Sequence, residues 1–307
     1  YQRSRGLGDV YKRQDADDET EGLMLMGDLN DDGFDDFVVS TPEADLVSMT
    51  DNGRVAVYYG SSSGLSELPD MIYAGASDGA QFGFGMDLGD FNNDGVLDLA
   101  VGSPGWAPAD DPTTRHGMVH VYLGNASGVS ASPWSNLTGV ANESLGSAVA
   151  ALHHANSGDG LAATARNHTV QVSPTQVDDG KVNLYTGNES GLHPMRNLTQ
   201  TENGGLFGRS LEACDVNNDG FDELIVGNTG TYDAPATYSS VEYFFGSTSG
   251  YNGTADHTVA SITQGRLFGL NIACVGDLNG DGFDEHIVSE PFNSTQSFGA
   301  GTLWLFE

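Results

Sequence analysis

The chain has 307 residues, with 43 Asp and Glu against 11 Lys and Arg, so its formal net charge is −32. This charge excludes a nucleic-acid-binding function, which needs a basic surface, and disfavours contact with an anionic membrane. Hydrophobic residues make up 38% of the chain, which is ample for a core. The sequence contains no apolar run of 18 or more residues, so it predicts no membrane span.

The first segment, residues 1–14, differs from the rest of the chain. It lacks Met at its start and contains four of the eleven basic residues. It has neither the apolar centre nor the small-residue cleavage site of a signal peptide, and it resembles a translated cloning adapter. We therefore expect a non-native segment at 1–14 and a folded region at 15–307.

One acidic motif recurs along the folded region. It reads DLNDDGFDD from Asp28, DFNNDGVLD from Asp90, DVNNDGFDE from Asp215 and DLNGDGFDE from Asp277. The starts are 62, 125 and 62 residues apart, so a degenerate copy is expected near residue 152, where the acidic residues have been lost. A regular period of about 60 residues predicts an array of structural repeats. The approximate repeats are 21–75, 76–140, 141–202, 203–260 and 261–307.

Short strand signals accompany each motif. An apolar run follows directly, as in FVVSTP and LAVGSP, and a second follows after a variable loop, as in GRVAVYYG and GMVHVYLG. These runs are rich in Val and Tyr and are bounded by Gly, Asn and Pro, whereas no capped amphipathic helix is evident. The sequence therefore predicts an all-β chain whose unit is about four short antiparallel strands, the blade of a β-propeller. The first repeat lacks the FG-containing strand that precedes the motif in the other acidic copies.

The nine-residue motif places oxygen-bearing side chains at positions 1, 3, 5 and 9. Position 6 is always Gly, which allows a tight curl, and position 7 offers its backbone carbonyl. All of these donors are hard oxygens, which favour Ca²⁺ over zinc or copper and over Mg²⁺. The expected ligands are Asp28, Asn30, Asp32, Phe34 and Asp36; Asp90, Asn92, Asp94, Val96 and Asp98; Asp215, Asn217, Asp219, Phe221 and Glu223; and Asp277, Asn279, Asp281, Phe283 and Glu285.

Two other interpretations of the motif were weighed. An EF-hand loop begins in the same way but carries a bidentate Glu at position 12, whereas position 12 here is Val in every copy. The flanks are also strands and not helices, which excludes the EF-hand. An Asp/Asn-Gly hairpin turn with incidental charge is the second alternative, and four copies of one oxygen spacing argue against it.

The frame FG…GD-x-N-x-DG-x-x-D, followed by an apolar strand, resembles the FG-GAP repeats of the integrin α-subunit N-terminal propeller over nearly all of residues 21–307. The resemblance implies seven blades, with Ca²⁺ between strands one and two of a blade. About five repeats are present, so we expect part of a seven-bladed propeller; a closed five-bladed ring is the alternative. Glu at position 9 departs mildly from the family pattern. The third repeat departs strongly, so about four ions are expected.

The ions are expected to be structural. Without a cation, the carboxylates of one loop repel each other, whereas an ion bound only to the folded state stabilises that state by mass action. Because Asn at position 3 reduces the charge, affinity is expected in the extracellular range of about 10⁻⁴–10⁻³ M.

Two features bear on the compartment. Eight Asn-x-Ser/Thr sequons suggest an exported, glycosylated surface, although a Ser/Thr/Asn-rich turn composition explains them equally. They lie at Asn125, Asn136, Asn142, Asn167, Asn188, Asn197, Asn252 and Asn293. Cys214 and Cys274 lie in the first strands of adjacent blades, where we favour buried thiols over a disulfide.

Two further groups of residues are weaker candidates. His153 and His154 lie in the degenerate loop, where solvated histidines are favoured over metal ligands. Trp106, Tyr232 and Tyr238 lie in long loops that, by the resemblance, connect strands two and three on the face opposite the calcium loops. Exposed aromatic residues there would suit partner binding, and packing under the loop is the equal alternative.

Together these features predict a calcium-stabilised extracellular or cell-surface module that binds or adheres to a protein or glycan partner. No nucleophile elbow, zinc motif or free carboxylate pair indicates an enzyme, and no membrane insertion is expected within this segment. The alternatives are an accessory propeller of a secreted hydrolase and a structural spacer of a surface protein. The full-length reading frame would discriminate among them.

Overall fold

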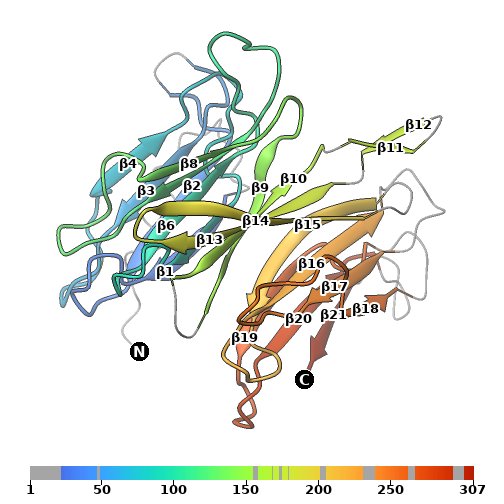
Figure 1. Ribbon diagram of the computed structural model, residues 1–307. Coiled ribbons are helices and arrows are strands. Elements are labelled where there is room, and N and C mark those ends of the chain that lie inside the picture. Colours follow the sequence, from blue (N-terminus) through green and yellow to red (C-terminus); the bar gives the residue numbers. More distant parts are fainter. Residues whose placement is uncertain are drawn as a thin grey trace. The chain divides into compact units, whose positions relative to one another are not determined.

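The structure is a computed structural model (Figure 1). It describes residues 22–46, 49–154, 158–167, 169–172, 175–178, 180–200, 205–230, 239–261, 267–292 and 301–307. The described residues form 21 strands and no helix. Accordingly, no helix in this part of the chain has the length and apolar character needed to cross a membrane. Among the predicted features, residues 1–14, Tyr232, Tyr238 and Asn293 lie outside the described residues.

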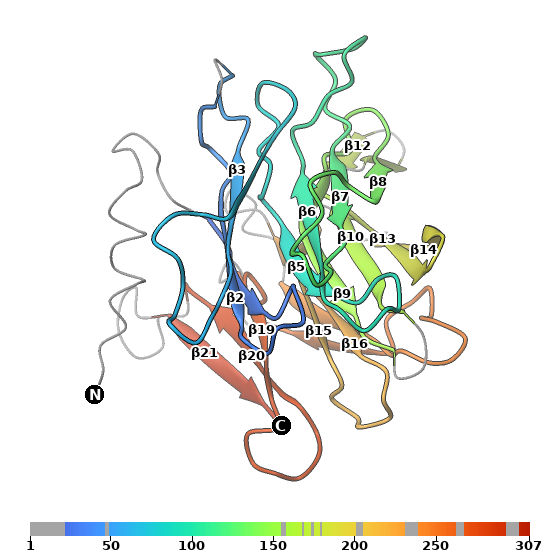
Figure 2. The ribbon, with the colours of Figure 1, turned by 90° about the vertical axis from the view of Figure 1, so that its left-hand side faces the viewer.

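Five antiparallel sheets follow one another along the chain, and each is called a blade here. In blades 1, 2 and 4 the four strands pair in sequence order (Figures 1 and 2). Blade 1 comprises β1 (Met24–Gly27), β2 (Asp36–Thr41), β3 (Arg54–Tyr58) and β4 (Met71–Ala74). Blade 2 comprises β5 (Met86–Gly89), β6 (Asp98–Ser103), β7 (Met118–Tyr122) and β8 (Ser135–Thr138). Blade 4 comprises β15 (Gly205–Cys214), β16 (Glu223–Gly230), β17 (Ser240–Phe244) and β18 (His257–Ala260).

Blades 3 and 5 vary this plan. Blade 3 pairs β9 (Leu145–Leu152), β10 (Gly160–Ala165), β13 (Lys181–Asn188) and β14 (Gly191–Thr199). A separate hairpin, β11 (Thr169–Val172) and β12 (Thr175–Asp178), lies between β10 and β13 in the sequence. Blade 5 has three described strands, β19 (Ile272–Gly276), β20 (Glu285–Glu290) and β21 (Thr302–Phe306). The predicted all-β fold of propeller blades is confirmed; the number of blades in a complete ring stays a prediction.

Burial explains why the central strands are apolar runs. Every residue of β2, β6 and β10 is buried, because a central strand has neighbours on both edges and packing on both faces. The fourth strands β4 and β8 instead bury one residue in four, and their sequences mix polar and apolar side chains. The short Val- and Tyr-rich runs of the sequence are therefore the second and third strands of the blades.

The chain divides into two compact units, residues 1–147 and 148–307. In the first unit, side chains of blades 1 and 2 share one core, formed by Leu29, Val38, Val55, Val57, Tyr73, Phe82, Met86, Leu99, Val101, Tyr122 and Val129. The second unit contains two buried clusters. One joins blades 3 and 4, with Leu152, Leu184 and Phe207 among its members, and the other joins blades 4 and 5 around Ile225 and Phe268.

One prediction about the first blade is wrong. The first repeat was expected to lack its first strand, yet β1 forms and pairs with β2 from Met24↔Val39 to Gly27↔Asp36. Met24 and Met26 are about half and two-thirds exposed, whereas Met86 at the start of β5 is buried. The backbone pairing thus does not need the FG dipeptide, because the ladder hydrogen bonds of an antiparallel pair come from the main chain.

Candidate metal centre

The four acidic motifs all occupy the same place in their blades. Each begins directly after the first strand of blade 1, 2, 4 or 5, and its ninth residue is the first residue of the second strand. The motif therefore forms the loop between strands one and two, as the resemblance implied. These four segments, 28–36, 90–98, 215–223 and 277–285, are called the acidic loops below.

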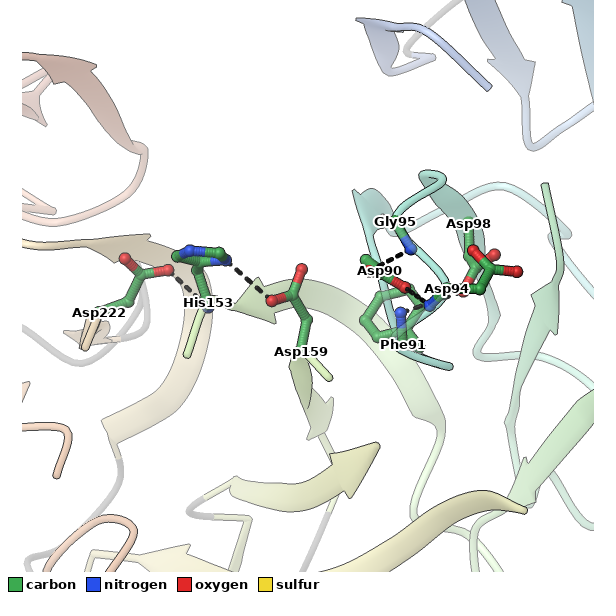
Figure 3. Close-up of polar contacts among 8 residues, drawn as sticks. All are labelled: Asp90, Phe91, Asp94, Gly95, Asp98, His153, Asp159 and Asp222. Atoms are coloured by element: carbon green, nitrogen blue, oxygen red, sulfur yellow. Dashed lines mark hydrogen bonds and ion pairs between the residues drawn. The ribbon is translucent and has the colours of Figure 1, made fainter. Parts of the chain in front are cut away.

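Hydrogen bonds within each acidic loop curl the chain around its own carboxylates. In the first loop, Asp28 accepts the N–H of Asp32 (3.1 Å) and the N–H of Gly33 (2.8 Å), while Asp32 accepts the N–H of Phe34 (3.0 Å). The other three loops repeat these bonds: positions 5 and 6 donate to position 1 at 2.8–3.1 Å, and position 7 donates to position 5 at 3.0 Å. Figure 3 shows Asp90, Asp94 and Gly95 gathered in this way.

Two positions of each acidic loop have left-handed backbone conformations. The Gly at position 6 has φ between +84° and +94°. Position 4 is also left-handed, with φ of +55° at Asp31, +62° at Asn93 and +56° at Asn218. Asp, Asn and Gly are the residues that tolerate this conformation. Position 4 is not among the expected ligand positions, and its residue type is explained by this backbone requirement.

At position 9, Asp36 and Asp98 lie fully buried at the base of their loops. Asp98 accepts the N–H of Phe91 (3.0 Å) with one carboxylate oxygen and the N–H of Gly124, after the third strand, with the other (2.9 Å). Asp36 makes the equivalent bonds from Leu29 and Gly60. The position-9 carboxylate therefore braces the loop against the third strand, a role that the sequence did not reveal.

In the two Glu-containing loops, the position-9 side chain reaches further into the loop. Glu285 accepts the N–H of Leu278 (2.7 Å) and the side-chain amide of Asn279 at position 3 (3.0 Å). Carboxylate oxygens of Asp277, Asp281 and Glu285 all lie within 4.8 Å of one another. In the fourth acidic loop, three expected ligands thus converge on a volume of the size that one cation would fill.

Burial and crowding disfavour the charged state of three position-9 carboxylates and raise the pKa values of Asp36, Asp98 and Glu223. Desolvation is the main cause that raises the pKa of Asp98 to about 7, with a further contribution from Asp94 and Asp90. For Glu223, desolvation, followed by repulsion from Asp219 and Asp215, raises the pKa to about 8. A divalent cation in these loops would relieve the repulsion, and the donor set of carboxylates, an amide and a carbonyl fits a hard cation such as Ca²⁺.

The degenerate third loop differs from its prediction in part. The side chain of His153 is 68% exposed, as a solvated histidine would be, and pairs with Asp159 at 2.9 Å. His154, in contrast, is buried, with its ring against Phe221 and Tyr251. The expectation of solvated histidines is therefore wrong for His154, because the neighbouring blade covers it.

The favoured prediction of buried thiols is also wrong. Cys214, the last residue of β15, and Cys274 in β19 form a disulfide that joins the first strands of blades 4 and 5. Their Cα atoms are 5.7 Å apart, within the usual range for a bonded pair. Their sequence separation of 60 residues is close to one repeat period, which places them at nearly equivalent positions of adjacent blades.

Among the candidate partner-binding residues, only Trp106 lies in the described part of the chain. It is half-buried in the β6–β7 loop, its ring contacts His116 edge-on at 6.4 Å, and its carbonyl accepts the N–H groups of His116 and Gly117. These contacts are the packing under the loop that was the alternative to partner binding. A partner-binding role for Trp106, Tyr232 and Tyr238 stays a prediction.

Comparison with known proteins gives matches to the repeats. A family model described as FG-GAP repeat matches residues 24–58, 82–122, 207–241 and 270–306. Phosphatidylinositol-glycan-specific phospholipase D of Mus musculus is 38% identical over 117 residues, which are 36% of this chain and 14% of that protein. Integrin alpha-PS2 of Drosophila melanogaster is 30% identical over 119 residues, 36% of this chain and 8% of that protein. The matched segment is thus a small part of each relative's length.

Among solved structures, the rhamnogalacturonan lyase PL11 of Bacillus licheniformis aligns with this chain at 11% identity. The alignment covers 86% of this chain and 54% of the lyase chain. Its TM-score is 0.47, which is too low for a shared fold to follow.

Proposed function

Because the chain carries FG-GAP repeats at four places, we propose that it is a calcium-stabilised extracellular β-propeller module that binds a protein or glycan partner in cell adhesion. The observation that carries the proposal is the set of four acidic loops with one shared geometry. Each presents hard oxygen donors at the same positions, and each lies at the same junction of its blade. About four structural calcium ions are expected, with the ligands named from the sequence.

The calcium part of the proposal is tested by calorimetric melting of the chain in EDTA and in 10 mM CaCl₂. With affinities of about 10⁻⁴–10⁻³ M, this concentration stabilises the fold by about 1.4 to 2.7 kcal/mol per site. The matched control carries Asn at position 5 of all four acidic loops (Asp32→Asn, Asp94→Asn, Asp219→Asn and Asp281→Asn). We expect calcium to raise the melting temperature of the wild-type chain and to leave the control almost unchanged. An identical melting temperature in both buffers would overturn the proposal of structural calcium.

Two observations support an extracellular or cell-surface location. The disulfide between Cys214 and Cys274 suits an oxidising compartment. Seven of the eight sequons lie in the described part of the chain, and all seven Asn residues are exposed, as a glycan acceptor must be. Glycosylation is tested by expression in a secreting eukaryotic cell, where peptide-N-glycosidase treatment should lower the apparent mass. An unchanged mass would contradict it.

The binding role rests on the resemblance to integrin α subunits and needs its own test. We expect a partner on the face opposite the acidic loops, where the β6–β7 loop carries Trp106. Immobilised chain is exposed to extracellular-matrix proteins and to an oligosaccharide array, with the quadruple Asn control beside it. A ligand that is retained in calcium and lost in EDTA would support the module. Failure to retain any ligand would favour the structural spacer.

A second candidate is an accessory propeller of a secreted hydrolase, and the observation that favours it is the 38% identity to a phospholipase D. Because the match covers only 14% of that protein, the chain would be a non-catalytic part of such an enzyme. The full-length reading frame distinguishes the two candidates. A catalytic domain in it would favour the hydrolase, whereas a membrane anchor would favour adhesion.

A further inference from the structure

The third loop lies at the same junction of its blade as the acidic loops, between the first and second strands, although the expected ligands are lost from it. Its blade's first strand, β9, ends at Leu152, so His153 stands at position 1. The second strand, β10, begins at Gly160, and Asp159 precedes it, so the third loop is one residue shorter than the acidic loops. The acidic loops have a carboxylate after the first strand and another at the start of the second. In the third loop these two places are taken by the imidazole of His153 and by Gly160, which has no side chain. A different interaction links the ends of this loop.

That interaction is the pair of His153 and Asp159. The imidazole Nδ1 lies 2.9 Å from a carboxylate oxygen of Asp159, so the Nδ1–H donates to the carboxylate (Figure 3). The side chain of Asp159 is only 11% exposed, so the carboxylate end of the bond is shielded from water, while the side chain of His153 is 68% exposed. Within the described part of the chain, no third His, Cys, Asp or Glu side chain joins this pair at metal-ligating distance. The pair therefore links the two ends of the loop.

The same His153 is bonded to the acidic loop of blade 4. Its backbone N–H donates to the carboxylate of Asp222 (2.7 Å; Figure 3). Its carbonyl accepts the N–H of Asp222 (3.2 Å). The next residue, buried His154, forms an isolated antiparallel bridge with Phe221, with ring centroids 5.9 Å apart. The Tyr251 hydroxyl donates to the carbonyl of Asp222 (2.9 Å). Positions 7 and 8 of this acidic loop are thus held on two sides.

The junction between blades 4 and 5 has the same backbone contact. The N–H of Asp284, at position 8 of the blade-5 loop, donates to the carbonyl of Asp215, at position 1 of the blade-4 loop (3.3 Å). At this junction, the position-1 residue is itself an expected calcium ligand, so a bound ion would fix it. At the junction between blades 3 and 4, the bond between His153 and Asp159 fixes the position-1 residue instead of an ion.

We propose that the third loop is an ion-independent anchor that prearranges the blade-4 acidic loop for calcium, with His153 as the positioning residue and Asp159 as its orienting partner. The anchor holds Phe221 and Asp222, which lie between the ligands Asp219 and Glu223. The inference rests on the proposed calcium sites. It makes calcium binding by the blade-4 loop dependent on His153, whereas calcium binding by the other three loops is not. Residues that orient metal ligands from outside typically change affinity by about 10–100-fold when they are replaced.

The test measures calcium affinity by isothermal titration in two backgrounds of the full chain. One carries Asp32→Asn, Asp94→Asn and Asp281→Asn, which leaves the blade-4 loop intact. The other carries Asp32→Asn, Asp219→Asn and Asp281→Asn, which leaves the blade-2 loop intact as the matched control. His153→Ala is introduced into both, and His153→Asn, whose amide can donate to Asp159 as Nδ1–H does, serves as the conservative variant.

In the blade-4 background, we expect His153→Ala to weaken calcium binding by about tenfold, in line with residues that orient ligands from outside a metal site, and His153→Asn to recover most of that loss. In the blade-2 background, neither variant should change the affinity. An equal loss in both backgrounds would mean general destabilisation and would overturn the anchor. An unchanged blade-4 affinity in His153→Ala would overturn it as well, while leaving the calcium sites in place.

A second measurement separates failure of the anchor from failure of the calcium proposal. Amide hydrogen exchange is followed in EDTA for the segment 219–223, which the anchor contacts, and for 94–98, which it does not. His153→Ala should speed exchange at 219–223 only, and His153→Asn should restore the slow rate. If the unmodified loops bind no calcium, the calcium proposal fails. The anchor is then judged by exchange alone, and unchanged exchange in His153→Ala overturns it.

Discussion

The position-9 carboxylates are predicted calcium ligands, and Asp36 and Asp98 also brace their loops through backbone hydrogen bonds. Asp98 is buried and accepts two backbone N–H groups from different parts of blade 2. Asp94 is exposed and accepts bonds from Asn92 and Val96 within its own loop. Both were predicted as ligands from the same spacing. Only the structure shows that one of them also holds the loop to the end of the third strand.

This difference predicts unequal effects of Ala at the two positions. In EDTA at pH 6, below the raised pKa of about 7, Asp98→Ala leaves the buried N–H groups of Phe91 and Gly124 without their acceptor. We expect it to lower the free energy of unfolding by about 2 kcal/mol or more, measured by urea denaturation. Asp94→Ala should stay within about 0.5 kcal/mol of the wild type. Equal losses would contradict the bracing role.

At the residue scale, the sequence predicted which side chains surround each loop but not how they are paired. The alternation of Asp and Asn around a Gly is a local pattern, so position and residue type could be assigned without a structure. The bond between His153 and Asp159 has no such pattern, because the third loop occurs once and has no copy for comparison.

At the scale of elements, the disulfide ties the first strands of two consecutive blades. The sequence placed Cys214 and Cys274 in those strands, but sequence separation carries no information on whether two Cβ atoms face each other. The packing of β15 beside β19 in adjacent blades brings the two cysteines together. Because the closed loop is long, the cross-link should restrict the unfolded chain appreciably.

Reduction of this disulfide should therefore destabilise the chain. We expect tris(2-carboxyethyl)phosphine to lower the unfolding free energy by about 2–4 kcal/mol, seen as a lower melting temperature in calorimetry. The double variant Cys214→Ser with Cys274→Ser is the control and should melt at the same temperature with and without reductant. A wild-type melting temperature that does not respond to reductant would show free thiols.

The acidic loops also predict a pH dependence for the calcium-free chain. In the folded state, burial and neighbouring carboxylates raise the pKa of Asp98 to about 7 and that of Glu223 to about 8, from model values of 3.8 and 4.5. Across the pH range between these values, the folded state binds more protons than the unfolded state. Stability must therefore fall as pH rises from about 4 to 8.

Melting temperatures in EDTA should accordingly decrease from pH 5 to pH 8. In 10 mM CaCl₂ the decrease should be smaller, because the ion binds the ionised carboxylates and releases their protons. Calorimetric scans at pH 5, 6, 7 and 8 in both buffers provide the measurement. An EDTA melting temperature that rises with pH would contradict the raised pKa values.

At the scale of the whole molecule, the net charge of −32 acts on every part of the fold. Repulsion among exposed carboxylates favours expanded states, and salt screens it, with a Debye length that falls from about 10 Å at 0.1 M to about 3 Å at 1 M. The described part of the chain has two compact units, and each contains acidic loops. The effect should therefore be general and not confined to one site.

We expect 1 M NaCl to raise the melting temperature in EDTA more than it does in 10 mM CaCl₂, because the bound ions already neutralise part of the charge. Sucrose at matched osmolality is the control for a solvent effect that does not depend on charge. Equal salt responses in both buffers would show that loop repulsion makes no measurable contribution.

The blades and the oxygen donors of the acidic loops could be predicted from the sequence because both depend on short stretches that repeat along the chain. A period of about 62 residues identifies the blades, and nine consecutive residues determine each loop. Three features were decided only by the tertiary structure: the disulfide of Cys214 and Cys274, the burial of His154, and the anchoring of Asp222 by His153. Each depends on which residues of adjacent blades meet in space. Packing between blades brings together residues that are 60 or more positions apart in the sequence, and no local sequence pattern relates such residues.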